Sequence, residues 1–223
     1  MAFHNNPRIV TDGLVLCLDA NAIGSYPGSG TTWYDISGND NTGTLQNNAQ
    51  FATLNNRKTI AFDGTDDYVT TTNAMDFGGD FTFTSWFIQT GAGASDSLIS
   101  LWTGGYGVGL FTYYSTTGAS FATKNTSDHQ AAGATAIAQN TWYYLVGTRS
   151  NTLLSVYLNG ELDGTKTTAD VNDLGTITPW IGRMRSGQHE LTGNIAATSI
   201  YNRAISATEV MQNFKALRSR FGI

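Results

Sequence analysis

Acidic and amide side chains gather in two short stretches of the sequence, and both could hold a metal ion. The first, WYDISGNDNTGTL, runs from Trp33 to Leu45 and sets Asp and Asn among small residues. The second, FDGTDDY, contains three Asp. Calcium prefers such carboxylate and carbonyl oxygens. The candidate metal ligands are Asp35, Asp63, Asp66 and Asp67.

The first stretch is not an EF-hand loop. That loop requires Gly at its sixth position and a bidentate Glu at its twelfth. A loop that begins at Asp35 has Asp40 and Gln46 at these positions. Two interpretations remain: calcium in another geometry, or Asp and Asn side chains that accept hydrogen bonds from the backbone of their own turns.

Residue patterns typical of enzymes are missing. Glycoside hydrolysis uses two carboxyl groups that flank one bond, but Asp66 and Asp67 are adjacent and would point to opposite faces of a strand. The sequence has no E-x-D-x-E, H-E-x-x-H or G-x-S-x-G motif. We therefore expect a protein that is not an enzyme and has no cofactor, with calcium as the one ion left open.

Aromatic side chains gather in the segment LWTGGYGVGLFTYY, and they suggest sugar binding. Aromatic rings beside polar groups are suited to stack against a sugar ring, because they are apolar on their faces and carry polar edges. The alternative is that half of these residues belong to the core. The candidates are Trp102, Tyr106, Tyr113 and Tyr114.

A β-rich single domain must position these residues. A chain of 223 residues can form one large sandwich with a sizeable core. Residues 80–90, DFTFTSWFIQT, alternate with apolar side chains on both faces, which predicts a strand between the core and a covering layer. Asn159 and Gly160 predict a tight hairpin, since both tolerate positive φ.

One helix is predicted, over residues 206–220. Ser206 and Glu209 form a capping box at its start, and Gly222 suits its end. An apolar stripe follows the capping box: Val210, Phe214, Leu217 and Phe221. This helix either covers an open sheet edge or presents its stripe to a partner.

The order of these segments resembles a known family. DGLVLCLDANAIGSYPGSGTTWYDISGNDNTGTL, IAFDGTDDYVTT, FTFTSWFI, TWYYLVGTRS and VYLNGELDGT, followed by GNIAATSIYNRAIS and the helix, are similar to a laminin-G-like domain of the concanavalin A-like lectin/glucanase superfamily. The resemblance covers nearly the whole chain. It implies an all-β jelly-roll sandwich of two antiparallel sheets with a short C-terminal α-helix, in one domain over residues 1–223 that begins with an N-terminal arm, residues 1–12.

Two details of the resemblance bear on function. Many relatives carry an acidic pair in the last strand that helps to hold calcium, whereas Ala196 and Ala197 stand at the matching positions here. The ending SIYNRAIS with the helix and RFGI is similar to a version in structural proteins of tailed phages, including phages of cyanobacteria. That version implies a virion protein, either a capsid decoration or part of a tail or fibre.

The charge distribution and the N-terminal segment suggest where such a protein acts. Residues 183–223 carry a net charge of +4 and the rest −9, which indicates either a solvated face or a surface that meets an acidic partner. If the phage resemblance holds, this surface is the candidate assembly interface with other virion proteins or with copies of this chain. Its candidate residues are Arg203, Lys215, Arg218 and Arg220. MAFHNNPRIV is polar and unlike a signal peptide, so we expect synthesis in the host cytoplasm and release in the virion. No motif for nucleic acid and no membrane-spanning apolar run is present.

Three hypotheses follow. The first is a non-catalytic phage structural protein on the particle surface, forming a homo-oligomer. The second is a lectin-like module that binds a cell-surface glycan, with or without calcium. The third and most remote is a polysaccharide hydrolase.

Overall fold

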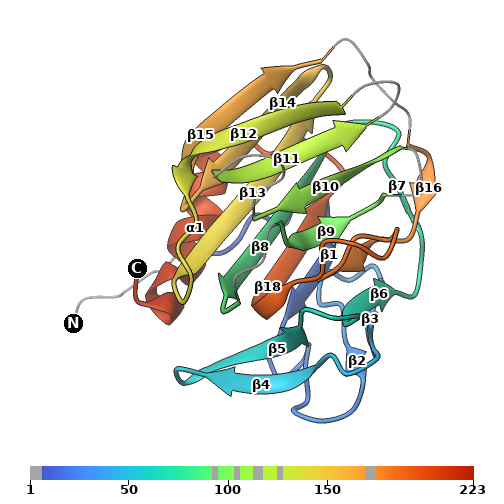
Figure 1. Cartoon of the computed structure of the whole chain (residues 1–223), viewed down its shortest axis with the longest axis vertical. Helices are drawn as coiled ribbons and strands as arrows, with labels where there is room; N and C mark the ends of the chain where they lie inside the picture. The colour runs from blue at the N-terminus through green and yellow to red at the C-terminus, as the bar shows by residue number, and fades with distance from the viewer. Residues whose placement is uncertain (1–6, 92–94, 103–105, 113–117, 125–127, 169–173) are drawn as a thin grey trace.

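The computed structural model describes residues 7–91, 95–102, 106–112, 118–124, 128–168 and 174–223. Two large antiparallel sheets face each other (Figure 1). The first sheet contains, in spatial order, β15 (Glu161–Thr167), β14 (Leu153–Leu158), β13 (Trp142–Ser150), β8 (Phe81–Gln89), β18 (Thr192–Tyr201), β5 (Arg57–Asp63) and β4 (Gln50–Leu54), with β1 (Leu14–Asp19) also paired to β18.

The second sheet lies across the core from the first. Its strands, in spatial order, are β12 (Asp128–Ala136), β11 (Gly118–Lys124), β10 (Gly107–Phe111), β9 (Ser97–Ser100), β17 (Trp180–Ile181), β6 (Tyr68–Thr71), β3 (Gly43–Gln46) and β2 (Thr32–Trp33). A small pair, β7 (Met75–Asp76) and β16 (Thr176–Ile177), lies apart from both sheets. The predicted two-sheet sandwich with one C-terminal helix is confirmed.

Strand β8 has the two apolar faces that its alternation predicts. All nine of its residues are buried. Phe81, Phe83 and Phe87 belong to the core between the sheets. Trp86 and Ile88 belong to a second apolar cluster on the other face of the first sheet. This second face therefore needs a cover of its own.

The helix α1 (Ala207–Phe221) provides that cover. Its Phe221 ring stacks on Trp86 with 4.1 Å between centroids and lies 4.8 Å from the ring of Trp142. Phe214 stacks on Trp86 at 5.8 Å and on Tyr144 at 6.3 Å. The stripe thus packs on the face of the first sheet. The predicted covering of the sheet by the helix is therefore confirmed, with one correction: the stripe lies on the face of the sheet and not only at its edge, because β8 and β13 leave large aromatic rings on that face.

Both ends of α1 have the predicted caps. The Ser206 side chain accepts a hydrogen bond from the Glu209 backbone N–H, and the Glu209 carboxylate accepts one from the Ser206 N–H at 2.7 Å. Gly222 closes the helix in the left-handed conformation, φ 75°. The hairpin between β14 and β15 is also confirmed, with positive φ of 51° at Asn159 and 90° at Gly160. None of the helical segments in the described residues has the length and hydropathy to cross a membrane.

Candidate functional site

The carboxylate of Asp35 organises the turn in the first acidic stretch. One oxygen accepts hydrogen bonds from the backbone N–H groups of Cys17 (2.8 Å) and Ser37 (2.9 Å). The other accepts from the N–H of Asn41 (3.0 Å) and the hydroxyl of Ser37 (2.7 Å). These contacts fix the loop against β1. Asp35 therefore has the turn-forming role that was the alternative to calcium binding.

The other three candidate metal ligands do come together. Oxygens of Asp63, Asp66 and Asp67 lie within 4.8 Å of one another, and Asp35 is not part of this group. Asp67 is buried, and its carboxylate accepts from the N–H groups of Asn48 (2.8 Å) and Asp63 (3.0 Å). Burial raises the pKa of Asp67, and the neighbouring carboxylates raise it further. The cluster has the carboxylate oxygens that a cation needs as ligands, but several of them already accept hydrogen bonds from backbone N–H groups of the loop. Calcium binding here stays a prediction.

The predicted sugar-binding aromatics divide between buried and exposed positions. Trp102 is only 5% exposed and packs with Phe111, Ala122 and Met184 in a small apolar cluster. A buried indole offers no face to a sugar, so the stacking role predicted for Trp102 is wrong in this structure. Tyr106 is half exposed. Tyr113 and Tyr114 lie outside the described residues.

A second aromatic group, which the sequence did not indicate, lies on the outer face of the second sheet. Val69 and Ile181 point into the core, so their neighbours Tyr68 and Trp180 point outward. The two outward rings stack with 4.0 Å between centroids and 15° between planes, and both are partly exposed. We call this pair the aromatic stack. The only signal in the sequence is that an aromatic residue precedes an aliphatic one in DYVTT and in PWIG.

Arg185 completes the aromatic stack with a cationic group. Its guanidinium carbon lies 5.8 Å from the centroid of the Trp180 ring, within the range of a cation–π contact. Its Nη1 donates to the carbonyl of Thr178 at 2.7 Å, which holds the side chain in place. Arg185 and Tyr106 also line a cavity of about 380 Å³ formed with residues of the 174–178 segment. Aromatic rings, a fixed cation and a hollow thus lie side by side.

Two acidic side chains, Asp96 and Glu190, are engaged within the protein. Burial raises the pKa of Asp96 to about 6, a value suited to a general acid. However, Asp96 is only 2% exposed and accepts a hydrogen bond from Gln89 at 2.7 Å. The Glu190 carboxylate lies 3.3 Å from the guanidinium of Arg183. Asp96 is therefore closed to a substrate, and Glu190 is held by an ion pair.

Two of the four predicted interface cations serve the chain itself. Arg203 contacts both Glu209 carboxylate oxygens, at 2.6 and 3.0 Å, and the Asp12 carboxylate at 2.9 Å. Arg220 lies 2.8 Å from both oxygens of Asp19. These pairs tie α1 to the N-terminal arm and to β1. Within the molecule, the charges of Arg203 and Arg220 are thus matched by carboxylates, and their part in an assembly interface stays a prediction.

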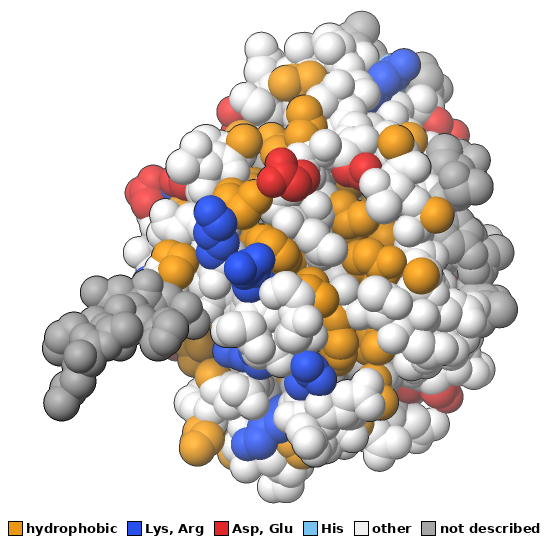
Figure 2. All heavy atoms as spheres, turned by 90° about the vertical axis from the view of Figure 1, so that its left-hand side faces the viewer, with side chains coloured by type: hydrophobic (Ala, Val, Ile, Leu, Met, Phe, Trp, Pro, Cys, Tyr) orange, Lys and Arg blue, Asp and Glu red, His pale blue; other side chains and the backbone are white. Residues whose placement is uncertain are grey.

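Lys215 and Arg218 differ from these two, because both are exposed on α1. Figure 2 views the side of the molecule on which α1 lies, and several Lys and Arg side chains appear among hydrophobic side chains there. Their part in an interface stays a prediction.

The family can now be assigned. Residues 63–211 match the family Laminin_G_3, described as the concanavalin A-like lectin/glucanases superfamily. The chain belongs to this superfamily. Among curated proteins, none is similar enough in sequence to count as a relative.

Several solved structures share the superfamily fold. Domain 4 of AbnA, a GH43 extracellular arabinanase of Geobacillus stearothermophilus solved with arabinotriose, is 14% identical with a TM-score of 0.73, over 90% of this chain and 97% of that one. Botulinum neurotoxin type C, which needs two ganglioside molecules to enter cells, is 13% identical with a TM-score of 0.69, over 93% and 52%. Trypanosoma rangeli sialidase, solved with sialic acid, is 17% identical with a TM-score of 0.65, over 92% and 33%.

These comparisons show the fold alone, because the identities are low. The chain spans nearly all of the arabinanase domain, about half of the neurotoxin chain and a third of the sialidase chain.

Proposed function

We propose that this chain is a carbohydrate-binding module without catalytic activity, and that its sugar binds at the aromatic stack. The observation that carries the proposal is the outward-facing pair of Tyr68 and Trp180 with Arg185 beside it. A stacked pair is rigid before any ligand arrives, so little side-chain entropy is lost on binding. Arg185 supplies N–H donors for sugar hydroxyl or carboxylate oxygens.

Two further observations support a binding role over hydrolysis. The raised pKa of Asp96 belongs to a side chain that is 2% exposed, so this acid does not reach a glycosidic bond. The structural neighbours named above were solved with arabinotriose or sialic acid, or depend on gangliosides. A sandwich that exposes aromatic rings on the outer face of one sheet is likewise suited to bind a sugar.

The experiment is a glycan array probed with the whole chain, with and without a chelator. We expect binding to at least one glycan class, and its loss in Trp180→Ala and Arg185→Gln. Leu162→Ala is the control, because Leu162 is an exposed apolar residue of β15 in the other sheet. Arg185→Gln leaves the apolar packing intact and separates lost binding from lost folding. An array without any signal, or binding that both variants retain, would refute the proposal.

A second candidate function is display on a phage particle. The exposed Lys215 and Arg218 on the outer side of α1 favour a contact with an acidic partner, since the apolar stripe of the helix is already covered. The two functions are compatible, because a glycan-binding module can be attached to a particle. Mass spectrometry of purified particles tests this candidate: the chain is expected among the particle proteins, and its absence would rule the candidate out.

A further inference from the structure

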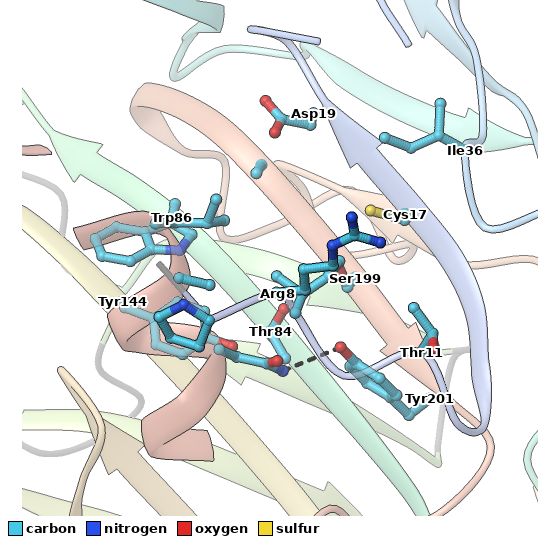
Figure 3. A pocket seen from close by; sticks show the side chains of 16 residues that line it. Arg8, Thr11, Cys17, Asp19, Ile36, Thr84, Trp86, Tyr144, Ser199 and Tyr201 are labelled. Atoms are coloured by element: carbon cyan, nitrogen blue, oxygen red, sulfur yellow. Dashed lines mark hydrogen bonds between the residues drawn. The ribbon is translucent and has the colours of Figure 1, made fainter. Parts of the chain in front are cut away.

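A cavity of about 330 Å³ lies between α1, the N-terminal arm and the first sheet (Figure 3). Several of its polar groups are paired within the protein. The Tyr201 hydroxyl accepts a hydrogen bond from the Asn213 amide at 3.0 Å, the dashed line that ends at Tyr201 in Figure 3. Both oxygens of Asp19 lie 2.8 Å from the guanidinium of Arg220. The indole of Trp86 is only 1% exposed, so this cavity has few polar groups that a ligand could reach.

The hollow beside the aromatic stack has a different wall. Its volume is about 380 Å³, within the range of about 300–1,000 Å³ that is typical of pockets for small molecules. We call it the Arg185 hollow; its lining residues are Ala74, Tyr106, Leu174, Thr176, Ile177, Thr178 and Arg185. None of these described lining residues is acidic. A mostly apolar wall with a few placed polar groups is typical of a ligand site.

The guanidinium of Arg185 is held in place and still has donors to offer. Its Nη1 donates to the Thr178 carbonyl at 2.7 Å, and its central carbon lies 5.8 Å from the centroid of the Trp180 ring. A guanidinium carries five N–H donors, of which this contact uses one. No nitrogen of Arg185 is among the buried atoms that lack a partner in the described part of the chain. The remaining donors are therefore open to solvent and can reach a ligand.

The charge of Arg185 has no counter-ion among the residues that the structure describes. Arg183, two residues earlier, is paired with Glu190 at 3.3 Å, whereas Arg185 contacts a carbonyl and a ring. The acid to consider is Asp76, because its β7 position is opposite Thr176 of the hollow. Asp76 does not line the hollow, and its Oδ1 accepts from the Gly78 N–H at 2.9 Å. A half-buried cation is normally paired, since burial removes part of its hydration; an anionic ligand would supply the missing charge.

We propose that the Arg185 hollow binds the carboxylate of an acidic sugar, so that the glycan taken at the aromatic stack contains a uronic or sialic acid residue. This inference rests on the proposed function and narrows its ligand class. One guanidinium can donate two parallel hydrogen bonds to one carboxylate, so Arg185 holds the acid without a second donor. The sugar ring packs on Ile177 and on the half-exposed Tyr106, whose ring is apolar and whose hydroxyl is polar. The exposed Thr176 faces the sugar hydroxyls.

The experiment compares acidic sugars with their own methyl esters, which keep every sugar ring and lose only the charge. Trigalacturonate and 3′-sialyllactose are the acidic probes, and isothermal titration calorimetry on the whole chain measures their affinities. We expect at least one acid to bind about tenfold or more tightly than its ester, the value of a hydrogen bond to a charged group. This preference should shrink as sodium chloride is added, because salt screens exposed charges.

Matched variants assign the preference to Arg185, and circular dichroism checks that each is folded. Arg185→Gln is expected to lower the affinity for the acid to that for its ester, while Arg185→Lys keeps part of the preference, because Lys retains the charge and loses the planar fork. Lys166→Gln removes the same charge from an exposed position of β15 in the other sheet and is expected to change neither affinity.

The outcomes distinguish this inference from the proposed function. Esters that bind the unaltered chain as tightly as the acids, with both lost in Trp180→Ala, would overturn the inference and leave the proposed glycan site standing. An acid preference that persists in Arg185→Gln would also overturn the inference. Binding of neither acid nor ester would count against both proposals.

Discussion

Replacing Asp35 by Ala tests whether this carboxylate supports a turn or a metal ion. The substitution removes the acceptor of three backbone N–H groups and one hydroxyl. The site is partly buried, so water replaces some of these bonds, and each backbone bond is worth about 1 kcal/mol. We therefore expect Asp35→Ala to lower the free energy of unfolding by about 3 kcal/mol, or the melting temperature by about 6–12 °C for a chain of this size.

The assay is urea unfolding followed by circular dichroism, in EDTA and in calcium chloride. Asp35→Asn is the matched variant. Its remaining oxygen can still serve Cys17 and Ser37, while its amide nitrogen faces the N–H of Asn41, so we expect an intermediate loss. The loss should be the same in both solutions. A loss below about 0.5 kcal/mol in Asp35→Ala, within the range of ordinary surface substitutions, or a loss seen only with calcium, would show that Asp35 does not support the turn in this way.

Three further predictions concern pH and packing. Burial raises the pKa of Asp96 to about 6, so between about pH 4 and 6 the folded state holds a proton on Asp96 that the unfolded state has lost. The free energy of unfolding therefore falls as pH rises from about 4 to about 6, by at most about 3 kcal/mol. Asp96→Asn should flatten this part of a urea-unfolding pH series. Hydrogen bonds from Arg203 and then Ser206 lower the pKa of Glu209 to about 2. The Glu209 carboxylate therefore stabilises the fold above about pH 4.5, and this stabilisation is lost on acidification toward pH 2. Glu209→Gln should make thermal unfolding less sensitive to acid over that range. Phe221→Ala removes a 3% exposed ring stacked on Trp86 and should cost about 3–5 kcal/mol in urea unfolding; a cost below 1 kcal/mol would mean that α1 does not seal the sheet.

The parts of the fold that sequence reasoning predicted correctly are those with local causes. The alternation in β8 depends only on neighbouring residues, since strand side chains point to opposite faces in turn. The capping box of Ser206 and Glu209 spans one helical turn, and the Asn159–Gly160 turn needs only positive φ. Each of these signals is complete within about ten residues, and the structure confirms each one.

The features that were missed depend on contacts between distant segments. Tyr68 and Trp180 belong to β6 and β17, and β17 has only two residues, which is too short to show alternation. Arg220 forms an ion pair with Asp19, which lies 201 residues away in sequence. The stripe of α1 indicated that the helix packs on something, but only the sheet order places β8 and β13 beneath it. Composition could not show that Trp102 turns into a buried cluster while Tyr106 stays half exposed.

The most direct test of the proposed function is to map a bound glycan on the whole chain by ¹H–¹⁵N spectroscopy of the Trp indoles. The best ligand from the array is titrated into labelled protein. If the glycan binds at the aromatic stack, the Trp180 resonance shifts with saturation, while those of Trp86 and Trp142 beneath α1 stay in place. Shifts at Trp86 and Trp142 without a change at Trp180, or a glycan that binds without moving the Trp180 signal, would contradict it.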